Sequence, residues 1–260
     1  MARWVAIGAV LAVAVLTVAA LTVAVLPAAA GACGAAALGE ARVAAIPDSR
    51  TVALDDGRLV RLAGIEWTVP AEAAKTALSD LLLDRPVSLR GAPAPDRYSR
   101  IHAFPFVSGS ETPVQYVLVE RGLAVMSRGA GDKACAEALL DRERAARTAR
   151  LGFWNSGDRQ HRADEADAVL RDQGRFAMVE GQVLSVRESG SLIYVNFGRR
   201  WSEDFTVTIA KRNEPTFIRA GLTPKSLSGR HVRVRGFVEE RAGPWIEAMR
   251  PEQFEVMTAK

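Results

Sequence analysis

Cysteine and histidine are scarce in this sequence. Its 260 residues include only two cysteines and three histidines. Two cysteines are too few for a disulfide-rich scaffold or for a four-cysteine zinc site. The histidines lie far apart and none belongs to an HExxH-like cluster, so a zinc hydrolase is not indicated.

Phosphate-binding and nucleophile motifs are also absent. The sequence has no GxxxxGKS/T, GxGxxG or GxSxG motif. Nucleotide switches, dinucleotide-binding enzymes and serine hydrolases therefore lose their main support. Glycine (21) and proline (12) are ordinary in number, which excludes collagen-like and low-complexity chains.

The composition that is present is that of a folded protein. Hydrophobic residues make up 48% and charged residues 25%, and the length predicts one or two domains. The net charge of +4 is a mild excess. It permits a polyanionic partner without requiring one, and it excludes a strongly basic protein of the ribosomal type.

The N-terminus has the pattern of an export or anchor segment. Arg3 precedes a run of 22 uncharged residues at 5–26, which is about the length that spans a bilayer. Small residues at 28–32 fit a cleavage site. We therefore predict a hydrophobic helix within residues 1–32 that acts as a signal peptide or membrane anchor. The rest of the chain would be extracytoplasmic, in the periplasm or cell envelope, and either membrane-anchored or secreted.

The two cysteines, Cys33 and Cys135, are predicted to form a disulfide. An oxidising compartment allows the bond, which would tie the start of the domain to a later helix. Two free cysteines are the alternative. Lipidation of Cys33 is a further option, although Ala30 stands where such sites usually have leucine.

Hydrophobic periodicity predicts a β-rich first domain with helices. Strand patterns and helical patterns both occur between residues 42 and 150. The strands are expected at 42–46, 51–54, 59–65, 86–89 and 101–107, and the helices at 71–83, 114–121 and 135–150. A proline-rich loop is expected at 91–100. Residues 155–175 are polar and are interpreted as a linker, in which a helix could cover 163–171.

The remaining chain is predicted to be almost entirely strands. They are expected at 176–187, 192–197, 205–209, 231–238 and 245–248, with a short helix at 224–227 and a final strand at 253–256. Five strands with a helix between the third and fourth have the order of an OB barrel. Residues 176–258 are thus expected to form a second, small OB-like β-barrel, with an open five-stranded sheet as the alternative.

Several stretches of the first domain have a recognisable order and spacing. They are TV at 51–52, DGRLVRLAGIE at 56–66, DRYSR at 96–100, VLVERGLA at 117–124 and RTARLGFW at 147–154. Together they resemble the staphylococcal nuclease, or thermonuclease, family over about residues 42–154. The resemblance implies a mainly β fold with α (α+β), a five-stranded OB-type barrel with packed helices, for a domain at residues 33–154.

The family resemblance also implies a chemistry. The family cleaves DNA and RNA phosphodiesters with Ca²⁺, which carboxylates hold through oxygen. A further carboxylate activates water, and arginines hold the charged phosphate. By resemblance, Arg61 and Arg100 take the phosphate-contacting positions, and Glu66 takes the position of a metal-binding aspartate.

Two departures from the family pattern affect that chemistry. Arg50 stands at the position of a second metal ligand, and Val69 stands where the family has the glutamate that activates water. Arg50 should repel Ca²⁺ and could pair with Glu66. The sequence therefore predicts a degenerate nuclease site, and Asp48 or Glu72 would have to replace the missing carboxylates in an active one. The alternative is a purely structural role, in which Arg61, Glu66 and Arg100 form a salt-bridge network that stiffens the mouth of the barrel.

The second barrel is a candidate for binding nucleic acid. Aromatic and basic residues on an OB barrel suggest that bases stack over a cationic groove. The candidates are Tyr194, Arg199, Arg200, Trp201, Arg233 and Arg235. Strand alternation predicts that Val232 and Val234 are buried and that Arg233 and Arg235 are exposed. Trp245 is expected to pack into the barrel instead.

Three functions remain open from the sequence. The first is an exported or membrane-anchored thermonuclease-like protein with a degenerate metal site, which binds nucleic acid or another envelope ligand. The second is an active Ca²⁺-dependent nuclease, a metal-dependent phosphodiesterase. The third is a non-enzymatic envelope interaction protein. The expected partners are single-stranded nucleic acid or an envelope protein, together with the membrane through the N-terminal segment.

Overall fold

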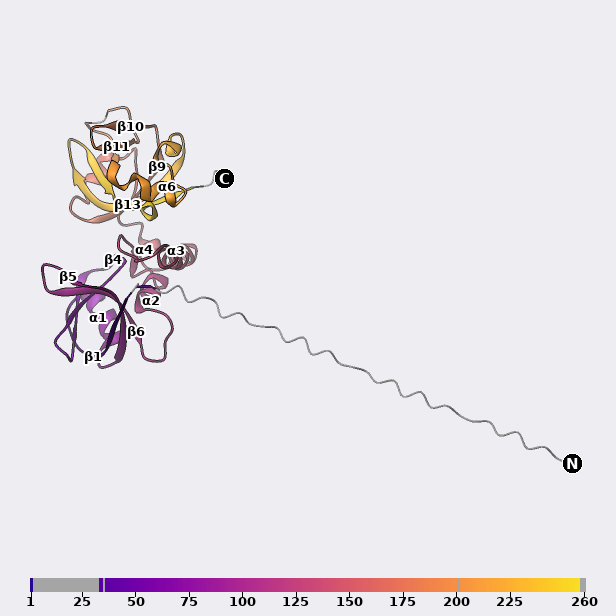
Figure 1. The fold of residues 1–260 in the computed structure, drawn as a ribbon. Helices are drawn as coiled ribbons and strands as arrows, with labels where there is room; N and C mark the ends of the chain where they lie inside the picture. Colours follow the sequence, from indigo (N-terminus) through magenta and orange to yellow (C-terminus); the bar gives the residue numbers. More distant parts are fainter. Residues whose placement is uncertain (2–32, 35, 201, 258–260) are drawn as a thin grey trace.

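The computed structural model describes residues 1, 33–34, 36–200 and 202–257, which form two β-rich units (Figure 1). The predicted signal peptide or membrane anchor at residues 1–32 lies almost wholly outside the described residues. Among the described residues, no helix is both long enough and apolar enough to cross a bilayer.

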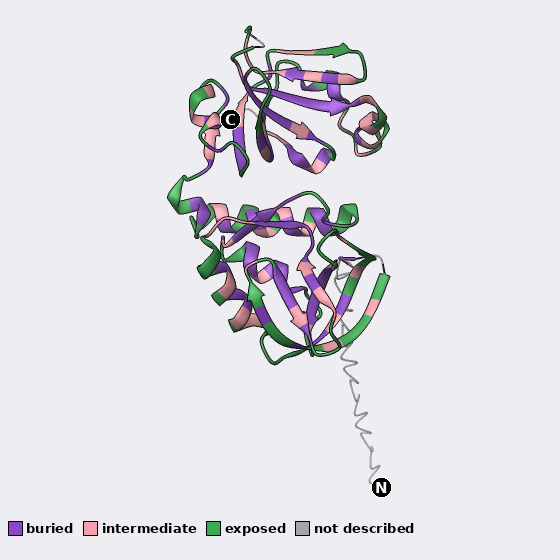
Figure 2. Cartoon of the chain, turned by 90° about the vertical axis from the view of Figure 1, so that its left-hand side faces the viewer, coloured by how far each residue is buried: buried purple, intermediate pink, exposed green. Residues whose placement is uncertain are grey.

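The first unit contains a closed five-stranded barrel. Its strands are β1 (Ala36–Asp48), β2 (Thr51–Leu54), β3 (Leu59–Leu62), β5 (Pro86–Pro95) and β6 (Arg100–Val107). Their order is β1-β2-β3-β6-β5, and only the β3–β6 pair is parallel. Because strand residues alternate between faces, Val43, Val52, Val60 and Leu89 fill the interior, each no more than 1% exposed. Figure 2 shows this burial along the barrel strands.

Helices and a small sheet cover the barrel. They are α1 (Ala71–Leu82), α2 (Val114–Glu120), α3 (Lys133–Thr148), α4 (Phe153–Ser156), and β4 (Ile65–Trp67) paired with β7 (Ala124–Met126). The helix expected at 71–83 is present as α1, and it buries Ala74, Leu78 and Leu82, which its periodicity places on one face. The mixed α+β, OB-type fold expected for this part is thus present.

The predicted disulfide is confirmed. Cys33 and Cys135 are bonded and lie 102 residues apart in the sequence. Cys135 sits in the first turn of α3, where the side chain of Asp132 caps the helix by accepting from the Cys135 N–H at 2.8 Å. The bond fastens the segment before β1 to this helix.

The second unit also consists mainly of β-strands. Its elements are β8 (Gln160–Arg162), α5 (Ala166–Leu170), β9 (Phe176–Gln182), β10 (Ser185–Ser189), β11 (Leu192–Asn196), β12 (Thr206–Ala210), α6 (Glu214–Arg219), β13 (His231–Glu240), β14 (Pro244–Ala248) and β15 (Phe254–Val256), with 3₁₀ turns at Lys211–Asn213, Pro224–Leu227 and Pro251–Gln253. The sheet runs β10-β11-β12-β14-β13-β9-β8, with β15 paired to β13 and with β12 and β14 parallel. When β9 and β10 are counted as one bent strand, the order from β9 to β14 is that of the first barrel. The Val183 N–H donates to the carbonyl of Arg230, just before β13, and the next N–H, of Leu184, donates to the carbonyl of Asn196 in β11. The chain therefore changes its pairing partner from β13 to β11 within two residues. This bend brings the sheet round on itself, as in an OB barrel.

Some element boundaries differ from those expected. The run at 59–65 forms two strands because Gly64 adopts a φ of 74°, and a side chain there would lie 2.7 Å from the Ala130 Cα. The proline-rich segment at 91–95 extends β5. Residues 155–175, interpreted as a linker, contain β8, which pairs with β9, and α5. The helix α6, which has Pro215 in its first turn, was not anticipated.

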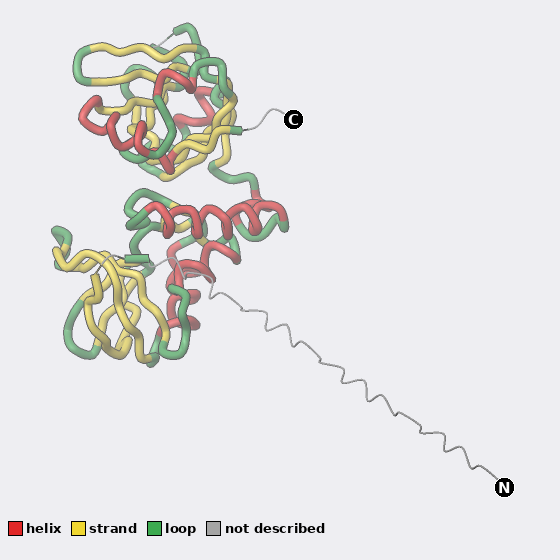
Figure 3. The backbone as a smooth tube through the Cα atoms, turned by 45° about the vertical axis from the view of Figure 1, so that its right-hand side comes forward, coloured by secondary structure: helices red, strands yellow, loops and turns green. Residues whose placement is uncertain are grey.

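The two barrels pack against each other through α3 and an apolar cluster. Figures 1 and 3 show α3 lying between them. The cluster joins residues of both units and consists of Val125, Ala146, Phe153, Trp154, Phe176 and Met178, with Phe237 packed against it. The contact between the two units is therefore itself a hydrophobic core. The barrel surfaces that form this contact are not accessible to a ligand.

Candidate functional site

A cavity of about 440 Å³ opens at the mouth of the first barrel, where the second barrel approaches it. The first barrel and its small sheet contribute Arg50, Arg61, Glu66 and His102. Additional cations come from the loop after β7 and from the segment after β14, namely Arg128 and Arg250. The cavity thus gathers four arginines around one carboxylate.

Local structure explains how these side chains meet. Arg61 lies between the buried residues Val60 and Leu62 on β3, so it points out of the barrel. The parallel β3–β6 register places it beside His102. Arg50 lies in the β1–β2 turn, where Asp48 Oδ1 accepts from its backbone N–H at 2.6 Å. The turn therefore holds Arg50 over the barrel mouth.

Glu66 is held by two of the arginines. Its side chain is almost fully buried, with Oε1 3.0 Å from Arg50 Nη2 and Oε2 3.5 Å from Arg61 Nη2. Burial lowers the pKa of the Arg61 guanidinium; Glu66 opposes this shift, and Arg50 and Arg100 reinforce it. The site is therefore short of negative charge and suited to an anion.

Arg100, a phosphate-contacting position by resemblance, pairs with a carboxylate beside the cavity. It is buried, does not line the cavity, and donates to Asp96 Oδ2 from Nε at 3.1 Å and from Nη2 at 2.9 Å. The same carboxylate accepts from the Tyr98 and Arg100 N–H groups. Burial alone would raise the pKa of Asp96, but these hydrogen bonds and one to His102 outweigh it and hold the pKa well below its usual range. Arg100 and Asp96 thus order the loop beside the cavity.

The residues at this site do not fit the Ca²⁺ that the family resemblance implies. Glu66 is engaged by guanidinium groups, and Val69 offers no oxygen ligand from its side chain. Asp48 caps its own turn, and Glu72 lies exposed in the first turn of α1; neither lines the cavity. The described part of the chain holds no group of three or more His, Cys, Asp or Glu residues that could bind a metal.

The expectation that Arg235 is exposed is wrong. The side chain is fully buried at the interface between the barrels, where Nη1 lies 2.7 Å from Oε2 of Glu143 on α3. Arg233 is also engaged, with Nη2 2.7 Å from Glu180 and Nη1 3.0 Å from Glu255. Strand alternation placed both arginines on the outer face of β13, but the first unit covers part of that face.

The other candidates on the second barrel separate into two groups. Tyr194 and Arg199 line a groove over β10, β11 and β12. Arg200 is exposed, pairs with Glu203 at 2.8 Å and lies outside the groove lining. Trp201 falls outside the described residues. Trp245 is buried as expected, but it lies beside Thr206 on the outer face and lines the groove instead of filling the barrel.

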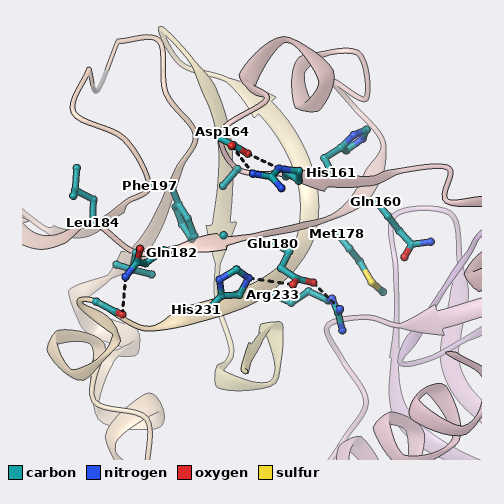
Figure 4. Close-up of a pocket in the computed structure, with 15 residues that line it drawn as sticks. Gln160, His161, Asp164, Met178, Glu180, Gln182, Leu184, Phe197, His231 and Arg233 are labelled. Atoms are coloured by element: carbon teal, nitrogen blue, oxygen red, sulfur yellow. Dashed lines mark hydrogen bonds and ion pairs between the residues drawn. The ribbon is translucent and has the colours of Figure 1, made fainter. Parts of the chain in front are cut away.

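Another hollow of about 770 Å³ lies beside β8, β9 and β13 (Figure 4). Its charges compensate one another. The carboxylate oxygens of Glu180 lie 3.1 Å from His231 Nε2 and 2.7 Å from Arg233 Nη2. Arg162 forms an ion pair with Asp164 at 2.7 Å. Because the charged side chains that line this hollow are already paired with one another, we assign no function to it.

Comparison with known proteins agrees with the fold of the first unit. Residues 68–156 match the family model described as staphylococcal nuclease homologue. No curated protein matches the chain. The chain therefore contains a domain similar to staphylococcal nuclease, and a nuclease-like, nucleic-acid-binding function is supported in general terms. The matched segment begins after Glu66, so it includes Val69 and Arg100 but not Arg50 or Arg61.

Proposed function

We propose that the protein is an exported nucleic-acid-binding protein built on a nuclease-like domain with a degenerate metal site. The main support is the 3.0 Å ion pair between Arg50 and Glu66. A guanidinium has only donors, whereas Ca²⁺ requires several oxygen ligands. Glu66, the carboxylate at the metal position, is paired with the Arg50 guanidinium, which cannot serve as a second metal ligand. We therefore do not expect efficient metal-dependent cleavage.

The remaining charges favour a phosphodiester ligand. Arg61, Arg128 and Arg250 line the cavity beyond the Arg50–Glu66 pair. Planar guanidinium groups match phosphate oxygens in geometry and charge. A cavity of about 440 Å³ is in the size range of small-ligand sites and suits one or two nucleotides better than a duplex. These features support a single strand as the ligand.

The export proposal has two supports in the chain. The 22-residue uncharged segment has the length of a bilayer span, and the Cys33–Cys135 disulfide is of a kind that persists in oxidising compartments. Cell fractionation with mass spectrometry of the N-terminus tests this. We expect the protein in the membrane or the extracytoplasmic fraction. Recovery of reduced, unprocessed protein from the cytosol would contradict export.

The binding test uses full-length protein in mild detergent and a labelled single-stranded DNA. Anisotropy measures affinity as salt is varied, and gels measure cleavage with Ca²⁺ or a chelator. We expect binding without Ca²⁺-dependent cleavage. Arg61→Ala should weaken binding and reduce the slope of log K against log salt by about 0.7. Arg85→Ala, an exposed control outside the cavity, should change neither quantity.

Two other results of this test would contradict the proposal. Ca²⁺-dependent cleavage that disappears in Arg61→Ala would show a working nuclease with rearranged ligands and overturn the degenerate-site proposal. No salt-dependent binding at all would favour a protein that contacts only envelope proteins. As a complementary test, Arg50→Asp removes the nearer of the two arginines from Glu66 and adds a carboxylate. We expect this variant, and not the wild type, to bind Ca²⁺ by calorimetry.

A further inference from the structure

The second barrel carries a groove of about 820 Å³ that is separate from the cavity described above. The pairing register aligns Arg187, Tyr194 and Thr208 in one row across β10, β11 and β12. A second row aligns Asn196 and Thr206 with Trp245 of β14. These residues share the outer face of the sheet, because the alternate residues between them fill the barrel.

The groove is on an accessible side of the molecule. The contacts to the first unit include β13, β15, the start of β9 and the segment after β14. Figure 1 shows β10 and β11 at the end of the second barrel that faces away from the first. A ligand could therefore occupy the groove without separating the two units.

Two aromatic rings form the centre of the groove. The rings of Tyr194 and Trp245 meet edge to face, with centroids 5.8 Å apart. The Arg241 guanidinium lies over the Trp245 ring at 5.0 Å. The Trp245 Nε1–H is buried and has no hydrogen-bond partner among the residues that the structure describes. A buried donor of this kind is costly unless a water or ligand accepts from it.

The charge of the groove has one sign. Every charged residue that lines it is an arginine: Arg187, Arg199 and Arg241. Arg241 is partly compensated by Glu239 at 2.8 Å. Arg187 is exposed and has no ion-pair partner among the described residues. The groove therefore combines an aromatic platform with cationic edges.

We propose that this groove binds single-stranded nucleic acid, with a base against Tyr194 and Trp245 and backbone phosphates beside Arg187 and Arg199. Stacking requires a base whose face is free, which a single strand supplies and a duplex does not. A neutral oligosaccharide could use the rings, but the arginines would add nothing to its binding. The proposal rests on the proposed nucleic-acid-binding function and adds a second contact region to it.

The test measures binding of full-length protein to a labelled oligo-dT and to an RNA of the same length. Tyr194→Ala should weaken binding about 5- to 150-fold, because base–aromatic stacking contributes about 1–3 kcal/mol per base. Tyr194→Phe keeps the ring and should retain most of the affinity. Arg187→Glu should weaken binding and lower its salt dependence, whereas Arg219→Ala, exposed on α6 and outside the groove, should not.

Tryptophan emission gives a second readout. Oligonucleotide should quench part of the fluorescence, and that part should be lost in Trp245→Phe. Circular dichroism confirms folding of each variant, and Arg187→Glu keeps the test valid if Tyr194→Ala does not fold, since Arg187 is exposed.

The outcomes separate this proposal from the proposed function. If Arg61→Ala weakens binding but Tyr194→Ala and Arg187→Glu do not, the groove proposal is wrong and the proposed function stands. If only the groove variants weaken binding, the groove proposal stands and the cavity is not the binding site. Salt-independent binding of a neutral oligosaccharide that Tyr194→Ala abolishes, without binding of oligo-dT, would overturn the groove proposal.

Discussion

Loss of either partner of the buried Arg235–Glu143 ion pair should strongly destabilise the protein, whereas loss of both partners should not. Arg235 is 0% exposed and Glu143 is 2% exposed, with Nη1 and Oε2 2.7 Å apart. The same Oε2 also accepts from the Met126 N–H at 2.8 Å. Because the two charges lie between the barrels, removal of one leaves the other buried without its partner.

The perturbation is Arg235→Met, which keeps an unbranched apolar stem, shorter than that of arginine, and removes the charge. Loss of one member of a buried ion pair costs about 3–5 kcal/mol. Glu255, whose Oε2 lies 3.7 Å from Arg235 Nη2, is too distant to be the main partner. We therefore expect the free energy of unfolding to fall by about 3–5 kcal/mol.

The double variant Glu143→Gln with Arg235→Met isolates the interaction. Glutamine retains an acceptor for the Met126 N–H, and neither side chain then carries a charge. Since two guanidinium nitrogens of Arg235 have no hydrogen-bond partner among the described residues, the wild-type pair is imperfectly compensated. The double variant should lie within about 1 kcal/mol of the wild type, because removing both charges also removes their desolvation cost.

The assay is equilibrium unfolding in guanidinium chloride, followed by fluorescence and circular dichroism. Arg200→Met is the matched control, because Arg200 pairs with Glu203 on the exposed surface; its loss should cost less than about 1 kcal/mol. The reasoning fails if Arg235→Met costs no more than this control, or if the effects of the two single changes simply add.

Three further predictions concern the first barrel. Removal of the Cys33–Cys135 bond, by reduction or by Cys135→Ala with Cys33→Ala, should lower the free energy of unfolding by about 4–5 kcal/mol, because the bond closes a loop spanning 102 residues. The Asp96 carboxylate has a pKa below its ordinary 3.8, so its stabilising effect is present above that pH and declines as pH falls through the folded-state pKa. Asp96→Asn should therefore be destabilising at pH 7, and acid titration of unfolding should show the difference shrinking below about pH 4; a pH-independent difference would contradict this cause. Gly91→Ala should cost at least about 1–3 kcal/mol in thermal or denaturant unfolding, since a methyl group there would overlap the His102 carbonyl oxygen; an unchanged midpoint would show that β5 and β6 can separate freely.

Periodicity is enough to predict much of this fold. The two-residue alternation of β3, β12 and β13 identifies residues such as Val60, Val207 and Val234, all of which are buried. The stripe on α1 and the disulfide likewise follow from spacing and cysteine count. These features depend on local sequence, so they can be read without knowing which elements meet.

Loop contributions to the sites could not be predicted in the same way. Arg128 and Arg250 reach the cavity from irregular segments, and Arg241 reaches the groove from the loop between β13 and β14. No periodicity constrains such residues. The pairing of Arg50 with Glu66 was foreseeable only because the family pattern aligned the two positions.

Arg235 and Trp245 show why alternation is incomplete as a guide to function. Alternation places Arg235 on the opposite face of β13 from Val234, and it places Trp245 on the opposite face of β14 from Ile246. Whether the outer face is open depends on what packs on it, and that is a long-range contact. The first unit covers Arg235 through Glu143, whereas Trp245, flanked by Tyr194 and Arg241, keeps 8% exposure and lines the groove. Two outward residues of one barrel therefore differ in their surroundings: Arg235 lies at the contact between the two units, and Trp245 lines the groove that we propose as a ligand site.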